Sequence, residues 1–188
     1  DYYFQTSNMT FPNATTDHSW YDLFAGSLSI ERNSLDYKQY PISGRKQFLV
    51  AQYVTGTEKY MPSPITDMGS FDRKVHSWLQ MKGEWEQYKT ISPYFNLGFM
   101  SELVLSSKNL MNNYTASVLQ APAFTPTPHS QIVFNEAFRA NQYVAFGLSP
   151  ILKFSKLLHF RLDMYGFAPL YEIKKEEVWN NNTYTAIP

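Results

Sequence analysis

The feature that most constrains this chain is a period-two alternation of apolar and polar side chains over segments too long for an ordinary strand. From Val75 to Tyr88, Leu79 and Met81 alternate with Gln80 and Lys82. Successive side chains of a strand point to opposite faces, whereas a helix would scatter them around its circumference. At a rise of about 3.3 Å per residue this segment reaches about 45 Å, far longer than the usual strand of about five or six residues. A tilted strand crossing a bilayer needs about nine to eleven residues, so length favours a membrane strand.

A second alternation runs from Leu157 to Phe167, with aliphatic side chains on one face and His159, Arg161 and Asp163 on the other. In segment 93–105 aromatic and aliphatic residues share one face. Turn-forming residues separate these segments and no helical stretch intervenes, so the pattern predicts an antiparallel all-β chain. The remaining predicted strands cover residues 24–32, 45–55, 114–120 and 143–152.

Segment 121–140 fits this pattern least well. Its prolines, Pro122, Pro126 and Pro128, prevent a central strand. We predict a long loop or a segment folded inward, and a strand that begins again near Phe138 is an open alternative.

Composition narrows the class of protein. Aromatic residues make up 17% of the chain although the mean hydropathy is negative, at -0.37. A membrane barrel has this composition because lipid-facing and lumen-facing residues alternate, but a Tyr-rich soluble β-sandwich has it too. The net charge of zero argues against a nucleic-acid partner. The absence of cysteine excludes a disulfide scaffold, and no apolar run is long enough for a transmembrane helix.

These observations predict one domain over residues 1–188, an antiparallel transmembrane β-barrel present as an incomplete portion of a larger barrel. Segment 180–188 reads as a loop rather than a closing strand, so we expect the natural protein to continue. The first residues lack a basic region followed by an apolar run. We therefore expect a removed signal peptide or a start inside a longer protein.

Two motifs resemble known barrels. The stretch Leu28-Ser-Ile-Glu-Arg-Asn-Ser-Leu-Asp36, followed by Gln39-Tyr-Pro-Ile-Ser-Gly44, resembles a turn of the bacterial surface-antigen barrel family. Gln120-Ala-Pro-Ala-Phe-Thr-Pro-Thr-Pro-His129, with Phe138-Arg-Ala-Asn141 and Leu158-His-Phe-Arg-Leu162, is similar to one branch, the C-terminal barrel of patatin-like phospholipases. The resemblance implies an outer membrane of a Gram-negative bacterium and a barrel that anchors an upstream lipase domain.

The sequence predicts no catalytic, cofactor or metal site in this chain. The Gly-x-Ser-x-Gly elbow of patatin lipases does not occur; Gly26-Ser27 and Gly69-Ser70 lack the flanking glycines. The four histidines are scattered, and no cysteine could complete a zinc site. Glu84 and Glu86 are spaced for a glycosidase pair, but nothing else supports catalysis.

The predicted strands provide two sets of candidate residues, one lining the barrel lumen and one forming an aromatic girdle. The polar faces predict lumen-lining residues whose charges pair with one another, with a bias on ion passage as the functional alternative. Aromatic residues near strand ends predict a girdle at the lipid headgroups. The lumen candidates are His76, Gln80, Lys82, Glu84, Glu86, His159, Arg161 and Asp163, and the girdle candidates are Trp20, Tyr21, Tyr60, Trp85, Tyr88 and Tyr94.

Three functions remain in competition. The leading hypothesis is an outer-membrane barrel that anchors or exports an associated domain. Its expected partners are outer-membrane lipid and an upstream lipase domain, and a homodimer stays open. The second is a soluble periplasmic or surface β-sandwich that binds carbohydrate through exposed aromatics, and the third is a secreted β-rich hydrolase.

Overall fold

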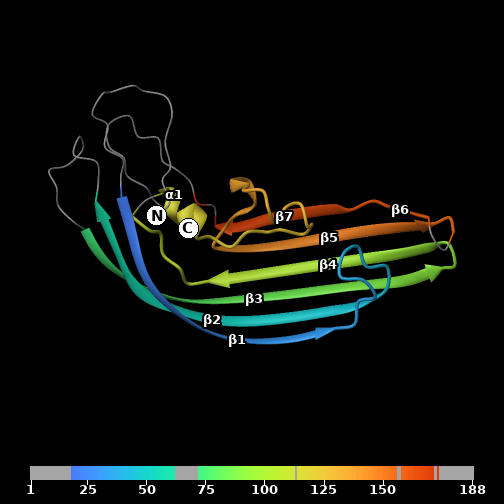
Figure 1. Ribbon diagram of the computed structural model, residues 1–188, viewed down its shortest axis with the longest axis horizontal. Helices are drawn as coiled ribbons and strands as arrows, with labels where there is room; N and C mark the ends of the chain where they lie inside the picture. The colour runs from blue at the N-terminus through green and yellow to red at the C-terminus, as the bar shows by residue number, and fades with distance from the viewer. Residues whose placement is uncertain (1–17, 62–71, 113, 156–157, 172, 174–188) are drawn as a thin grey trace, which may run out of the picture.

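The strands form one antiparallel sheet that curves into a trough, as Figure 1 shows. The computed structural model describes residues 18–61, 72–112, 114–155, 158–171 and 173. Its seven-stranded sheet has the order β1-β2-β3-β4-β5-β6, and β7 also pairs with β5. No helix among these residues is long and apolar enough to cross a membrane. The strands are β1 (His18–Asn33), β2 (Gly44–Met61), β3 (Asp72–Ser92), β4 (Phe95–Ser106), β5 (Gln142–Lys153), β6 (His159–Arg161) and β7 (Met164–Tyr171).

The all-β antiparallel prediction is confirmed, and the first three strands are longer than expected. They contain 16, 18 and 21 residues, respectively. Strands β6 and β7 occupy the single segment predicted at 157–167, of which Leu157 lies outside the described residues. Both pair with β5 without a register shift between them: Lys153 lies opposite His159, and Leu148 lies opposite Met164.

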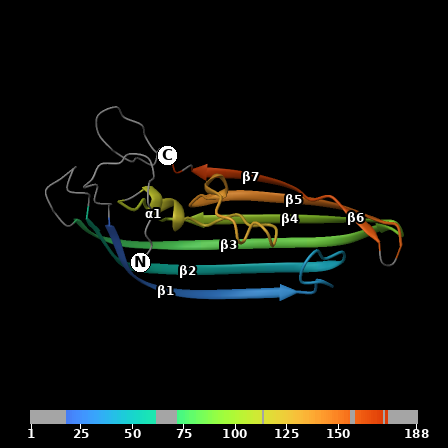
Figure 2. The ribbon, with the colours of Figure 1, turned by 45° about the horizontal axis from the view of Figure 1, so that its top comes forward.

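The strand predicted at 114–120 is wrong. Tyr114–Leu119 forms the short helix α1. This segment lies on the concave side of the sheet, where no strand is available to pair with it (Figures 1 and 2). A helical turn satisfies its own backbone hydrogen bonds, so this location outweighs the β preference of Tyr114 and Val118.

The sheet is open. Its edges are β1 on one side and β6 with β7 on the other, and among the described residues these edges do not pair with each other. Closure into a barrel is therefore not observed. The expected loop at 180–188 lies outside the described residues.

The convex face of the sheet is apolar and exposed. Phe24 and Leu28 are 78% and 73% exposed. Such an area is far larger than the scattered apolar residues of a normal soluble surface. This convex apolar face consists of Phe24, Leu28, Ile30, Leu49, Tyr53, Val75, Leu79, Met81, Trp85, Phe99, Leu103, Leu105, Val144, Phe146, Leu148, Leu152, Phe160, Leu162, Met164 and Leu170.

The concave face is polar and partly filled by the loop between β4 and β5. This loop, residues 107–141, folds back over the sheet (Figure 2). Its Phe124 and Ala140 pack with Val104, Tyr143 and Ala145. A second cluster joins Met111 of the loop to Val54 and Trp78. The inward fold predicted for 121–140 is thus present, and the predicted re-entry near Phe138 is limited to a single bridge between Ala123 and Arg139.

The turn between β1 and β2 is organised by Asp36. Its Oδ1 accepts hydrogen bonds from the N–H groups of Tyr37 (3.0 Å), Ile42 (3.0 Å) and Ser43 (3.2 Å). Partial burial acts to raise the pKa of Asp36, but these hydrogen bonds stabilise the carboxylate and keep its pKa below the ordinary value. The Asn-Ser-Leu-Asp motif therefore encodes a loop that folds onto itself.

Gly44 closes the same turn with a backbone that only glycine adopts easily. Its φ is +103°, and an added Cβ would lie 2.2 Å from the carbonyl oxygen of Ser34. Both features exclude a side chain at this position.

We expect Gly44→Ala to lower the free energy of unfolding by about 2 kcal/mol, because it adds backbone strain and a backbone clash. Urea denaturation followed by tryptophan fluorescence measures the change. Gly26→Ala is the matched control, since a Cβ at Gly26 meets nothing within 4 Å. Equal stability of both variants would contradict the structure of this turn.

Candidate functional site on the concave face

The concave face gathers most of the predicted lumen residues. Alternation along β3 directs His76, Gln80, Lys82, Glu84 and Glu86 to this side, which is less exposed than the convex side. Arg161 and Asp163 join them from the far edge of the sheet. His159 is instead exposed at the start of β6. Sequence reasoning did not select Lys46, Glu58, Glu102 or Tyr143, which complete the cluster.

A ladder of charges crosses three neighbouring strands. Glu84 lies between two lysines, with Lys46 Nζ 2.8 Å from its Oε2 and Lys82 Nζ 2.9 Å from its Oε1. Lys82 also lies 3.2 Å from Oε1 of Glu102, which accepts a hydrogen bond from the hydroxyl of Tyr143. The charges therefore link β2, β3 and β4, and the Tyr143 hydroxyl extends the network to β5. Because both Glu84 oxygens are held by lysines, its carboxylate has a structural role rather than that of a free acid.

A second polar cluster is centred on Glu58, which is fully buried (0% exposed). Its Oε2 lies 2.7 Å from Nε2 of His76, and its Oε1 accepts a hydrogen bond from the hydroxyl of Tyr21 at 3.2 Å. The backbone N–H of Asn112 lies 3.2 Å from both oxygens. Glu58 thus ties three strands to the loop that enters the trough.

Arg161 fastens the far edge of the sheet to the β1–β2 turn. Its Nε donates to Asp163 Oδ1 at 2.7 Å, one terminal nitrogen donates to the carbonyl of Pro41 at 2.8 Å, and the other donates to the Tyr88 hydroxyl at 3.1 Å. The guanidinium also lies over the rings of Tyr88 and Tyr40. The nitrogen that donates to Tyr88 also donates to the Ser149 hydroxyl at 3.3 Å, so four hydrogen bonds hold the guanidinium in place across the trough.

Tyr88 has room for this position because its neighbour across the strand is Gly98. A Cβ on Gly98 would lie 2.4 Å from Cε1 of Tyr88. The glycine therefore lets the ring lie flat against β4, where its hydroxyl reaches Arg161.

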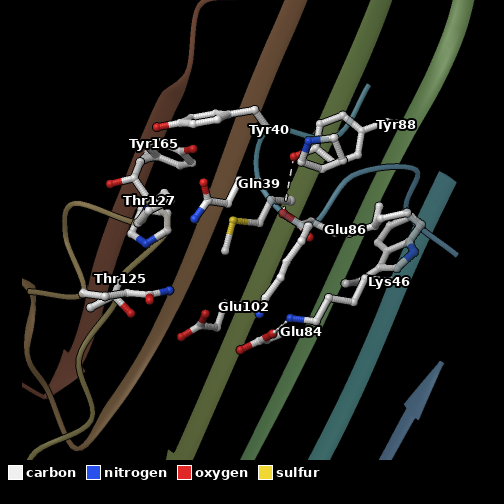
Figure 3. A pocket seen from close by; sticks show the side chains of 18 of the residues that line it. Gln39, Tyr40, Lys46, Glu84, Glu86, Tyr88, Glu102, Thr125, Thr127 and Tyr165 are labelled. Atoms are coloured by element: carbon white, nitrogen blue, oxygen red, sulfur yellow. Dashed lines mark hydrogen bonds and ion pairs between the residues drawn. The ribbon is translucent and has the colours of Figure 1, made fainter. Parts of the chain in front are cut away.

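A polar cavity of about 370 Å³ lies between the sheet, the β1–β2 turn and the loop in the trough. Figure 3 shows Glu84, Glu86 and Glu102 projecting from the sheet, with Thr125 and Thr127 of the loop nearby. The turn contributes Gln39 and Tyr40. The cavity is therefore formed by segments far apart in the sequence.

Lys108 lies beneath the loop in a poorly solvated position. It is 8% exposed, its Nζ donates to the carbonyl of Gln120 at 3.0 Å, and it lies 5.1 Å from the Trp78 ring centroid. Burial without a carboxylate partner lowers the pKa of Lys108 to about 8. The cation is retained here at a cost to stability.

The girdle candidates differ in exposure and in the face that they occupy. Trp20, Trp85 and Tyr94 are exposed, and Trp85 contacts Phe99 edge-on on the convex face. Tyr60 is half-buried near the end of β2. Tyr21 and Tyr88 point into the trough, toward Glu58 and Arg161, so they cannot belong to an outward girdle. Proximity to a strand end did not reveal which face these two tyrosines occupy, although their alternation with Trp20 and Trp85 carries that signal.

The described residues contain no group of three or more His, Asp or Glu side chains placed to hold a metal ion. No protein-family model matches this chain, and comparisons with curated proteins and with solved structures gave no significant match.

We expect Glu58→Ala to lower the free energy of unfolding by about 3 kcal/mol, because it leaves His76, Tyr21 and the Asn112 N–H buried without their shared acceptor. Urea denaturation measures the loss. Lys59→Ala is the adjacent control and should change stability by less than about 0.5 kcal/mol, since its pair with Asp22 is exposed and 3.8 Å long. A small effect at Glu58 would show that the loop does not depend on this carboxylate.

We expect the stability of the protein to rise relative to Lys108→Met as the pH increases from 7 to 10.5. The folded protein releases the Lys108 proton near pH 8, whereas the unfolded chain releases it near pH 10.4, so the cost of burying the cation disappears over this window. The gain should approach about 3 kcal/mol. Unfolding free energies of both proteins across the range provide the measurement, and parallel pH profiles would contradict the burial of this cation.

Proposed function

We propose that this chain forms part of the wall of a transmembrane β-barrel in a bacterial outer membrane, where the barrel anchors or exports an associated domain. The observation that carries the proposal is the position of charges on the convex side. Among the described strand residues at outward-facing positions, charges occur only near the strand ends. Asp22, Lys59 and Arg73 lie at one end, and Arg32, Arg45 and Lys89 at the other.

The uncharged band of the convex face, between these two rows of charged residues, is about as tall as the apolar part of a membrane barrel. On β3 it extends from Val75 to Trp85, a length of about 33 Å along the strand at a rise of about 3.3 Å per residue. A tilt of about 40° reduces this to a height of about 25 Å, the apolar height of outer-membrane barrels. Exposed Trp20 and Trp85 near opposite ends of the band would face the headgroups.

The two ends of the sheet differ as barrel ends do. At the end with Tyr94 the strands are joined by the ten-residue β1–β2 turn (34–43) and by the two-residue turn 93–94, whereas the loop 107–141 leaves the other end and enters the trough. Outer-membrane barrels have short periplasmic turns and longer extracellular loops. We therefore propose that the end with Tyr94 faces the periplasm.

The proposal requires further strands. Backbone groups at the edges β1 and β7 would be without partners in lipid, which makes an open edge very unfavourable. Additional strands, from the rest of this protein or from a second copy, would close the wall. The resemblance to patatin-linked barrels suggests an upstream lipase domain as the associated domain.

The soluble sandwich that binds carbohydrate is less well supported. A sandwich needs a second sheet against its apolar face, and the described strands all belong to one sheet whose apolar face is uncovered. The aromatic residues on this face are mixed with many aliphatic residues, which favours lipid over sugar.

Substitution at two depths tests the proposal. Met81→Arg places a charge in the middle of the band and should destabilise the protein folded into lipid vesicles by about 2–4 kcal/mol. Position 47 also faces outward, but it lies beside the charged residues at the strand ends. Gln47→Arg should therefore change stability by less than about 1 kcal/mol. Chemical denaturation from vesicles measures both.

The unsubstituted protein should require detergent to stay in solution and should migrate differently on a gel before and after heating. A protein that is folded and soluble without detergent, and that Met81→Arg leaves equally stable, would refute the membrane proposal.

A further inference from the structure

Three cations form a line on the convex face, at the end of the sheet that carries Tyr94. Arg32 of β1, Arg45 of β2 and Lys89 of β3 occupy outward-facing positions on three neighbouring strands. Arg32 and Lys89 are exposed, and Arg45 is half-buried. None of the ion pairs found among the described residues involves any of them. Their positive charges are therefore available to a partner outside the sheet.

The carboxylates at this end of the described strands β1 to β3 lie on the other side of the sheet. Alternation turns Glu31, Glu84 and Glu86 toward the concave face, where the last two line the polar cavity. Asp36 lies in the β1–β2 turn, which folds over the concave side and holds this carboxylate through three backbone N–H groups (Figure 1). The convex side at this end is thus positive across three strands.

The pairing register staggers the three cations evenly. Arg32 lies opposite Gln47, two residues from Arg45, and Arg45 lies opposite Gln87, two residues from Lys89. Each step to the next strand therefore moves the cation about 6.6 Å closer to this end of the sheet. With strands about 4.8 Å apart, successive Cα atoms in the line are about 8 Å from each other.

This stagger brings the cations to nearly one height in a membrane. The apolar residues of the convex face are displaced in the same direction, because Gln87 lies opposite Phe99, which lies opposite Leu148 in the middle of β5. For a strand tilt of about 40°, a line of constant height moves about 4 Å along each successive strand. The stagger exceeds this by so little that the three Cα atoms lie within about 4 Å of one height.

We infer that Arg32, Arg45 and Lys89 bind the headgroup phosphates of anionic phospholipids in the periplasmic leaflet. This inference rests on the proposed membrane location and on the proposed orientation of the sheet. Two side chains whose Cα atoms are about 8 Å apart can hold one phosphate between them, and arginine binds it through two parallel N–H groups. The ammonium of a zwitterionic headgroup cancels the phosphate charge, so a line of cations favours a headgroup that lacks one.

Lipid competition on the folded full chain in detergent micelles tests the inference. The protein is mixed with equal amounts of phosphatidylglycerol and phosphatidylethanolamine, and native mass spectrometry measures the adducts of each lipid. We expect phosphatidylglycerol adducts to be about fivefold or more in excess. This excess should decrease as the ionic strength rises, because salt screens exposed charges. A separate mixture contains phosphatidylglycerol and lipid A, the phosphorylated lipid of the outer leaflet.

Two double variants, each lacking two outward-facing cations, locate the effect. Arg32→Gln combined with Arg45→Gln should reduce the excess of phosphatidylglycerol to less than about twofold. Lys59→Gln combined with Arg73→Gln is the matched control, since these residues lie opposite each other at the other end of the sheet, and it should leave the excess unchanged. Lys89→Gln alone should have a smaller effect than the first double variant. Heat-modifiable migration on a gel confirms that each variant is folded.

The inference is wrong if both phospholipids form equal adducts, or if the two double variants lose the excess equally. It is also wrong if lipid A displaces phosphatidylglycerol and the first double variant abolishes that preference, because the cations would then face the outer leaflet. The requirement for detergent and the effect of Met81→Arg are measured separately. A protein that passes those tests but shows no preference for phosphatidylglycerol would refute this inference and leave the membrane proposal standing.

Discussion

A strand in a single-layer sheet can turn each side chain to only one of two sides, and the other features of this chain depend on that constraint. Alternation along β3 places Leu79 and Met81 on the convex side and Lys82 and Glu84 on the concave side. Charged groups gathered on one side of a curved sheet must satisfy one another, because curvature brings them together away from bulk water. The ladder at Glu84, the cluster at Glu58 and the contacts of Arg161 are three local solutions to this requirement.

The loop 107–141, which lies in the trough, supplies further contacts to these groups. Asn112 supplies a backbone donor to Glu58, and Phe124 supplies apolar cover for Tyr143. A buried ion pair adds little net stability compared with apolar residues of the same size, but it fixes which groups meet. We therefore regard the Glu58 cluster as the element that gives the loop its position, while the Phe124 and Met111 clusters bury its apolar side chains.

The alternation made much of the fold predictable from the sequence. The faces of segments 75–88 and 93–105 are read directly from residue parity, and the same parity places Lys82, Glu84 and Glu86 together. The partners from other strands were not predictable, since pairing register decides that Lys46 lies opposite Glu86 and reaches Glu84. Glu58 was not predicted to face the concave side because the predicted strand ended at residue 55, whereas β2 continues to Met61. Helix α1 was missed because strand preference is a local property, whereas its position over the concave face is a tertiary one.

The same constraint explains why the two faces differ in what they can bind. The convex face between its charged rims offers neither a charge nor a concave pocket, so it suits a fluid apolar environment better than one specific ligand. The concave face instead sets carboxylates and cations against one another, Glu84 with Lys46 and Lys82 and Asp163 with Arg161, so these polar groups hold the strands in their relative positions.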